Sequence, residues 1–417
     1  MDYLVELREK GAKAKQAARQ LAVLSTTVKN RALLQMADAL EKRRDDILEA
    51  NAVDIERGRQ KKLSGALIDR LMLTEVRIRA MAEGLRQLAD LADPIGQTLG
   101  GALRPNGLDI RQIRVPLGVV GMIYEARPNV TVDAAGLCLK SGNAVILRGG
   151  SEAITSNTII ARIIAYAAEQ AGAPENSIQL IETTDRQAVN EMLRLNEYLD
   201  VIIPRGGAGL IRTVVENATV PVIETGNGVC HTFVDATADL AMASDIAFNA
   251  KVSRPGVCNS METLLVHEAV ASDFLPGMLE RYAVAGVELR GCPETMKYYS
   301  AVKPATEEDW ATEYHDLILS VRVVANLDAA LEHIFRYGTR HSEAIVTSDL
   351  ANANRFQREV DAACVYVNAS TRFSDGFEFG FGAEIGISTQ KLHARGPMGL
   401  NEMTSTKYLI NGAGQTR

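Results

Sequence analysis

Cys258 lies in the segment SRPGVCN, where small residues and the pair Pro255-Gly256 indicate a loop rather than an apolar face. Arg254, four positions earlier, could favour the thiolate, which is the reactive form of cysteine. The segment fits a catalytic nucleophile, although a structural cysteine remains an equally good interpretation of this context alone.

The other cysteines are weaker candidates for chemistry. Cys138 falls on an apolar helical pattern and Cys364 in the strand-like run ACVYV, where cysteine acts as a small apolar residue. Cys230 has His231 beside it, but neighbouring side chains of a strand point to opposite faces, so these two cannot form a catalytic pair. The five cysteines include no C-x-x-C and the six histidines no H-E-x-x-H, so we expect no metal site.

Two further segments suit a nucleotide. PRGGAGL (204–210), with Gly206 and Gly207, follows one predicted strand and opens a helix, so its amides could hold a phosphate, although a plain turn is an equal alternative. Arg148 and Ser151 stand at the end of another strand, in ILRGGSE, and suit a ribose 2'-phosphate. The second segment therefore favours NADPH over NADH, although arginines at strand ends are common.

Regular alternation of strands and helices must position these residues. From residue 118 onward, strands such as GVVGMIYE, AVILRGG and LDVIIP, with a shorter run PVIET (221–225), alternate with helices, which predicts a doubly wound parallel sheet. A second lobe with the same alternation begins after Gly226. We therefore predict an α/β protein with two doubly wound lobes.

The residues before this region follow other patterns. The first 90 or so residues indicate helices, including one from about Ser25 to Glu49 with an apolar stripe of Leu33, Met36, Ala37, Leu40 and Ile47. Residues 97–116 indicate a β-hairpin around Pro-Asn-Gly. Because an uncovered hairpin needs a partner, we expect it to make a homo-oligomer, together with a tail strand near 406–412.

Composition excludes several classes of function. A net charge of -7 over 417 residues argues against a nucleic-acid binder. The charged N-terminal segment has no signal-peptide pattern, and no run of about 18 apolar residues suits a membrane span. We expect a cytoplasmic protein.

Five strings carry a resemblance to a known family: YEARPNVTVD, CLKSGNAVILRGG, IPRGGAGL, VYVNASTRF and STQKLHARGPMGL. They occur in order through nearly the whole chain, which closely resembles the γ-glutamyl phosphate reductases of the aldehyde dehydrogenase superfamily. The resemblance implies an NADP-binding domain at 1–227, interrupted by the 97–116 hairpin extension. It also implies a catalytic domain at 228–399 with the nucleophilic cysteine, and a tail at 400–417 that contributes an oligomerisation strand.

The resemblance also implies the reaction and its residues. Cys258 would attack L-glutamyl 5-phosphate, phosphate would leave, and NADPH would reduce the thioester to glutamate 5-semialdehyde, with Asn129 stabilising the oxyanion. Glu313 matches loosely the glutamate that holds the nicotinamide ribose. A functional association with glutamate 5-kinase, which would supply this substrate, is also implied.

The substrate's charged groups call for matching side chains near Cys258. We expect Arg254 near the phosphate, and Arg372 and Asp375 at the amino-acid end. Glu224 aligns with the water-activating glutamate of hydrolytic dehydrogenases, and its role stays open. The alternatives are therefore a hydrolytic NAD-dependent aldehyde dehydrogenase and a catalytically silent assembly module on the same fold.

Overall fold

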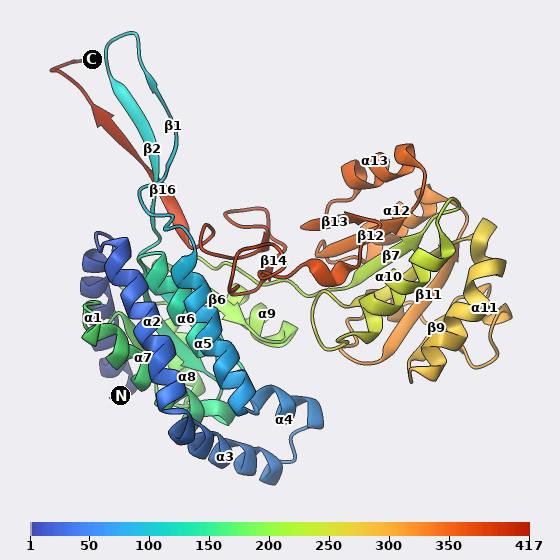
Figure 1. Ribbon diagram of the computed structural model, residues 1–417, viewed down its shortest axis with the longest axis horizontal. Coiled ribbons are helices and arrows are strands. Elements are labelled where there is room, and N and C mark those ends of the chain that lie inside the picture. Colours follow the sequence, from blue (N-terminus) through green and yellow to red (C-terminus); the bar gives the residue numbers. More distant parts are fainter. Residues whose placement is uncertain (1) are drawn as a thin grey trace. The chain divides into compact units, whose positions relative to one another are not determined.

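The computed structural model describes residues 2–417, apart from the side chains of Asp2 and Ala66 (Figure 1). The chain forms two compact units. The first unit comprises the chain up to Thr225 with Gly380–Gly386 and Met398–Arg417, and the second comprises Gly226–Phe379 and Ile387–Pro397. Among the described residues, no helix is long and apolar enough to cross a membrane.

Five helices begin the first unit: α1 (Asp2–Leu21), α2 (Thr26–Lys42), α3 (Arg44–Gln60), α4 (Gly65–Leu71) and α5 (Glu75–Asp90). The prediction of one helix from Ser25 to Glu49 is wrong, because the helix breaks at Arg43, whose φ and ψ are -103° and 21°. The break lets α2 pack against α5 and α7 (Ile154–Gln170), while α3 packs against α4 and α7. The predicted apolar stripe is nevertheless buried on both sides of the break.

The sheet of the first unit is parallel, with the strand order β5-β4-β3-β6. Its elements in chain order are β3 (Val119–Tyr124), α6 (Asn129–Lys140), β4 (Ala144–Gly149), η1 (Ser151–Ala153), α7 (Ile154–Gln170), β5 (Ile178–Leu180), α8 (Arg186–Met192), β6 (Val201–Arg205) and α9 (Ala208–Asn217). The predicted strand PVIET is reduced to one bridge between Val222 and Ile202, so this expectation is wrong in extent. The alternation otherwise follows the prediction.

A separate antiparallel sheet of three strands belongs to the first unit, in the order β1 (Thr98–Leu103), β2 (Asp109–Pro116), β16 (Thr404–Asn411) (Figure 1). The hairpin and the tail strand are thus found where the sequence predicts them. Gly107 in the hairpin turn has a φ of 86°, which glycine adopts without strain. Every position of β1 is exposed, so this edge of the sheet is uncovered in the single chain.

The second unit contains a parallel sheet of seven strands in the order β10-β9-β11-β8-β7-β12-β13. Its elements are β7 (Cys230–Val234), α10 (Leu240–Val252), β8 (Met261–His267), α11 (Glu268–Val284), β9 (Glu288–Gly291), η2 (Thr295–Lys297), β10 (Lys303–Pro304), η3 (Asp309–Ala311), β11 (Ile318–Val324), α12 (Leu327–Tyr337), β12 (Ser342–Val346), α13 (Leu350–Glu359), β13 (Cys364–Val367), η4 (Thr371–Phe373), β14 (Ile387–Ser388) and β15 (Gly396–Pro397). The last two form a short antiparallel pair.

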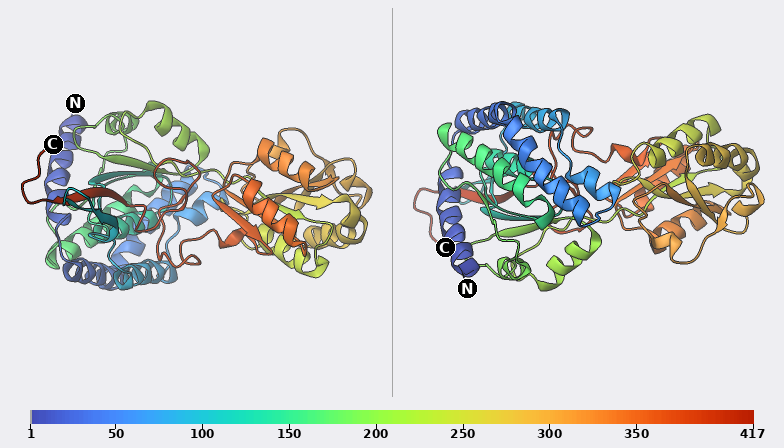
Figure 2. Two further views of the ribbon diagram at one scale, coloured as in Figure 1. Left: turned by 90° about the horizontal axis from the view of Figure 1, so that it is seen from above. Right: turned by 90° about the horizontal axis from the view of Figure 1, so that it is seen from below.

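Two apolar clusters lie on opposite faces of this sheet. Leu264 and Val266 of β8 pack with α10 and α11, whereas Leu265 between them packs with α12 and α13. Successive side chains of a strand point to opposite faces, so both faces of the sheet are covered by helices (Figure 2). The predicted doubly wound α/β architecture is confirmed.

Candidate active site

Cys258 is half-buried in the loop between α10 and β8 of the second unit. The backbone behind it is closely packed: its carbonyl oxygen accepts a hydrogen bond from the Cys230 thiol at 3.2 Å. A Cβ atom on Gly228 would lie 1.4 Å from the same oxygen, so only glycine fits there. The position of the cysteine is therefore fixed by the backbone, while its side chain remains accessible in part.

Asn259, the next residue, joins the cysteine loop to the loop around η4. Its side-chain amide donates to the carbonyl oxygens of Arg372 and Ser374, at 3.2 and 2.8 Å, and its Oδ1 accepts from the Arg372 guanidinium. The Asn259 carbonyl accepts from the Thr371 hydroxyl at 2.7 Å. Sequence reasoning missed this residue, and its only signal was its place beside Cys258.

The structure brings the predicted substrate-binding residues near Cys258. The Arg372 guanidinium also donates to the Ser253 hydroxyl at 3.2 Å. Burial lowers the pKa of Arg372, as does Arg254, whereas Asp375 and Cys258 act in the opposite direction. Arg254, Asp375 and Cys258 therefore each lie within electrostatic reach of Arg372.

Cys230 is buried, whereas Cys258 is only half-buried. Burial, followed by the Glu343 carboxylate, raises its pKa well above that of a free thiol. Its sulfur lies 3.7 Å from Nδ1 of His341, which the sequence did not single out, whereas the adjacent His231 pairs with Glu343 at 2.9 Å. The expectation that Cys230 and His231 form no pair agrees with this geometry.

A buried ion pair anchors the loop that carries Glu313. Lys251 and Glu262 are both fully buried and lie 2.6 Å apart. Burial raises the pKa of Glu262 and lowers that of Lys251, while each charge favours the other. Glu262 also accepts a backbone hydrogen bond from His315, whose ring lies 3.3 Å from Glu313. Glu313 thus stands on a well-fixed loop of the second unit.

Asn129 belongs to the first unit and is the first residue of α6. The alternative that Asn129 caps this helix is wrong, because Pro128 occupies the cap position and no side chain makes a capping hydrogen bond. The exposed Asn129 amide instead donates to the Asp133 carboxylate at 2.9 Å, one turn further on. Burial raises the pKa of Asp133 to about 6, although the Asn129 hydrogen bond and Arg205 oppose this shift. This bond uses one of the two amide hydrogens of Asn129 and leaves the other without an acceptor among the described residues.

The residues expected to hold a 2'-phosphate lie at the end of β4. Arg148 is 9% exposed, its Nη2 donates weakly to the Thr184 carbonyl at 3.4 Å, and its buried Nε has no hydrogen-bond partner among residues 2–417. Burial lowers the pKa of Arg148, Glu152 opposes this and Arg186 adds to it, so a second guanidinium is near. Ser151 is exposed beside them. An unpartnered buried donor and two neighbouring cations fit a phosphate group.

The glycine segment after β6 is a less open site for a phosphate. The Gly207 amide donates to the Glu125 carboxylate at 3.0 Å, and a Cβ on Gly206 would lie 2.6 Å from the same carboxyl group. A cofactor phosphate at this helix end would have to displace that carboxylate. Sequence reasoning missed Glu125, which comes from the loop after a different strand.

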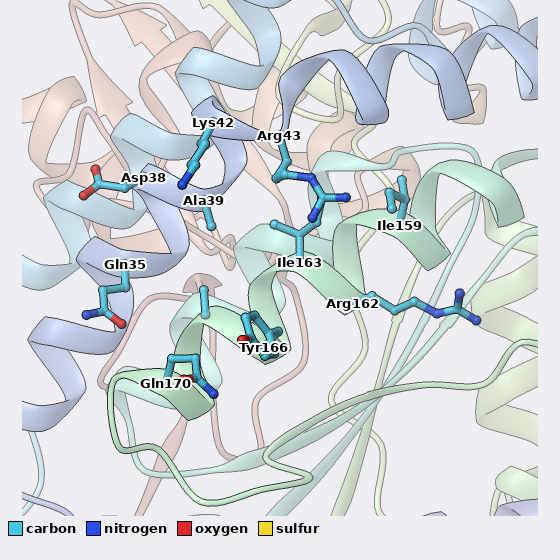
Figure 3. Close-up of a pocket in the computed structure, with 11 residues that line it drawn as sticks. Gln35, Asp38, Ala39, Lys42, Arg43, Ile159, Arg162, Ile163, Tyr166 and Gln170 are labelled. Carbon is cyan, nitrogen blue, oxygen red and sulfur yellow. The ribbon is translucent and has the colours of Figure 1, made fainter.

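An open groove of about 710 Å³ lies elsewhere on the first unit, between one face of α2 and one face of α7 (Figure 3). Ile159, Ile163 and Tyr166 line it together with Arg43 and Arg162. None of the predicted site residues line this groove. Among residues 2–417, no group of His, Cys, Asp and Glu could hold a metal ion.

Comparison with known proteins bears on the identity of the chain. The model of the aldehyde dehydrogenase family matches residues 6–292. The chain is 65% identical to the γ-glutamyl phosphate reductase of Moorella thermoacetica over 417 residues, which is the whole of both chains. It belongs to the γ-glutamyl phosphate reductases.

Other matches agree with this assignment. The γ-glutamyl phosphate reductase of Heliobacterium modesticaldum is 63% identical over 412 residues, 99% of each chain. The crystal structure of the Thermotoga maritima γ-glutamyl phosphate reductase has a TM-score of 0.96 at 51% identity, covering 99% of this chain and 100% of that one. An acetylating aldehyde dehydrogenase of Geobacillus thermoglucosidasius, 18% identical with a TM-score of 0.72 and coverage of 100% and 98%, shares the fold. The family expected from the sequence is confirmed.

Proposed function

We propose that this protein reduces L-glutamyl 5-phosphate to L-glutamate 5-semialdehyde and phosphate with NADPH, the second step of proline synthesis from glutamate. The observation that carries the proposal is full-length identity of 65% to a γ-glutamyl phosphate reductase. The clustering of Cys258 with Arg254, Arg372 and Asp375 supports it, because this substrate carries a phosphate, a carboxylate and an ammonium group.

Cys258 is the proposed nucleophile. Its thiolate attacks the acyl carbon, the carbon–oxygen bond to phosphate breaks, and inorganic phosphate leaves from a thioester on the sulfur. Arg254 is exposed in the same loop, and its proposed role is to stabilise the departing phosphate charge. Arg372 and Asp375 hold the α-carboxylate and the α-ammonium groups, respectively, so that the acyl carbon faces the sulfur.

Asn129 is the proposed oxyanion donor. One hydrogen of its amide is given to Asp133, which orients the side chain and leaves the other hydrogen for the charge that develops during attack and reduction. A donor held in advance stabilises the transition state more than the neutral substrate. Asp133 therefore helps to preorganise the donor.

The first unit is the proposed cofactor domain. Arg148 and Ser151 read the 2'-phosphate of NADPH, Gly206 and Gly207 approach its diphosphate, and Glu313 of the second unit holds the nicotinamide ribose. When bound, the nicotinamide supplies the hydride that converts the thioester to the aldehyde and frees the thiolate. Glu224 lies half-buried in the first unit, and the reduction needs no water-activating base there.

Two partners complete the proposal. The uncovered edge strand β1 carries exposed Leu99 and Leu103, and β16 carries exposed Tyr408 and Ile410, so the three-stranded sheet is the proposed contact between subunits of a homo-oligomer. Glutamate 5-kinase is the proposed functional partner, because it makes the acyl phosphate that this enzyme consumes.

Two assays test the proposed function. In the forward direction, glutamate, ATP and a glutamate 5-kinase are supplied with the enzyme, and NADPH oxidation is expected only when every component is present. In the reverse direction, oxidation of glutamate 5-semialdehyde with NADP⁺ is expected to require inorganic phosphate. Steady oxidation without phosphate would instead identify a hydrolytic dehydrogenase.

A further inference from the structure

Both polar atoms of the Asn259 side chain, Nδ2 and Oδ1, make hydrogen bonds to the loop around η4. Its Nδ2 donates to the carbonyls of Arg372 and Ser374, and its Oδ1 accepts from the Arg372 guanidinium. The reversed amide would place an oxygen against two carbonyl oxygens and a nitrogen against a guanidinium, so only this orientation satisfies every group. At 4% exposure, Asn259 has no alternative partner in solvent.

These bonds connect the loop of the proposed nucleophile to Arg372. Asn259 is covalently joined to Cys258 and contacts Arg372 at both its backbone and its guanidinium, across 113 positions of the chain. A further bond from the Thr371 hydroxyl to the Asn259 carbonyl ties the same two loops. Movement of the Arg372 side chain is therefore transmitted to the backbone of the cysteine loop.

We propose that Asn259 is the positioning residue that fixes the Cys258 thiolate relative to the Arg372 guanidinium. Binding of an anionic group of the substrate at Arg372 then sets the attack geometry at Cys258, so recognition of the amino-acid end controls the chemical step. Asn259 acts through Arg372 and touches no reacting atom. The inference rests on the proposed function, in which Cys258 attacks and Arg372 binds the α-carboxylate.

Asn51 provides a matched control in the first unit. It is 3% exposed, its Nδ2 donates to the Leu71 carbonyl and the Ser156 hydroxyl, and its Oδ1 accepts from the Leu73 amide. It therefore ties two segments together as Asn259 does, but contacts neither the cysteine loop nor Arg372. Replacement of Asn51 therefore shows how much kcat/KM changes when hydrogen bonds with a purely structural role are lost.

The test is a double-mutant cycle in the phosphate-dependent oxidation of glutamate 5-semialdehyde. Asn259→Ala and Arg372→Ala are each expected to lower kcat/KM by roughly 10- to 100-fold, because misplaced reacting groups lose rates of this order. The double variant is expected to equal Arg372→Ala within about threefold, since one residue acts through the other. Asn51→Ala is expected to lower the Tm but to leave kcat/KM per folded molecule within about twofold of the wild type. Its effect on kcat/KM is expected to multiply with that of Arg372→Ala.

A second substrate separates positioning from general damage. Propanal lacks the α-carboxylate and α-ammonium groups, so Asn259→Ala is expected to change its kcat/KM less than about threefold. The inference would be overturned if Asn259→Ala lowered kcat/KM equally for both aldehydes. It would also be overturned if the losses of kcat/KM in Asn259→Ala and Arg372→Ala multiplied in the double variant.

Asn259→Asp serves if the alanine variant does not fold. It keeps the size and the acceptor for Arg372 but loses both donations to the carbonyls, and the same cycle applies to it. A wild-type enzyme without phosphate-dependent activity would refute the proposed function, whereas multiplied effects in an active enzyme would refute only the role of Asn259.

Discussion

Replacement of Asn129 by alanine removes the proposed oxyanion donor with little effect on the fold. The side chain is exposed and donates a hydrogen bond to Asp133 at 2.9 Å, so its loss should cost about 1 kcal/mol or less of stability. Because one preorganised donor to an oxyanion is worth on the order of 100-fold or more in rate, kcat should fall by that amount. Catalysis and stability therefore respond very differently to this substitution.

The assay compares kcat per folded molecule, with the folded fraction and the Tm measured on the same samples. Asp133→Ala is the companion variant: it leaves the Asn129 donor in place but unrestrained, so its loss in kcat should be smaller than that of Asn129→Ala. If kcat of Asn129→Ala stays within a few fold of the wild type, the oxyanion assignment is wrong. Equal and large losses of Tm in both variants would point instead to a structural role for this pair.

Three further outcomes are expected. Arg148→Ala should weaken NADPH binding by roughly 1.5 to 3 kcal/mol and spare NADH, as measured by fluorescence titration, and equal losses would show that Arg148 does not read the 2'-phosphate. Deletion of the 97–116 hairpin should convert an oligomer to monomers in light scattering, and a wild-type monomer would refute the subunit contact. Burial lowers the pKa of His333 from 6.5 to about 2, with His231 and Arg322 acting the same way, so stability should be lost as the pH falls below about 6.5. In His333→Gln, the free energy of unfolding measured with urea should fall less steeply between pH 6 and 5, by up to about 1.4 kcal/mol per pH unit. An unchanged slope of this free energy against pH would refute the prediction.

Most of the architecture could be predicted from the sequence because the periodic patterns of apolar residues are strong. The alternation after residue 118 predicts the parallel sheets, and the Pro-Asn-Gly turn predicts the hairpin. The break at Arg43 was not predictable from periodicity, since the apolar stripe continues across it from Leu40 to Ile47. The break accompanies the packing of α3 on α4 and α7, and these tertiary contacts are not encoded in the local apolar pattern.

The candidate site likewise contains residues that local sequence indicates and residues that it does not. Cys258 was singled out because its loop chemistry is local, resemblance supplied Asn129, and the roles of both stay predictions. The bonds of Asn259 to Arg372 and Ser374, and of Glu125 to Gly207, join segments distant in the chain. Local pattern contains no information on such pairings, and neither Asn259 nor Glu125 differs in type from ordinary polar residues of a loop.

Mass spectrometry of the enzyme can show whether Cys258 carries the acyl group during the reaction. Glutamate 5-semialdehyde and NADP⁺, supplied without phosphate, should leave a glutamyl thioester on the peptide that contains Cys258, and added phosphate should remove it. Cys258→Ala should form no adduct, whereas Cys138→Ala, which only removes a buried sulfur from α6, should form it normally. An unmodified Cys258 peptide in an enzyme that turns over, or near-normal turnover by Cys258→Ala, would contradict the account.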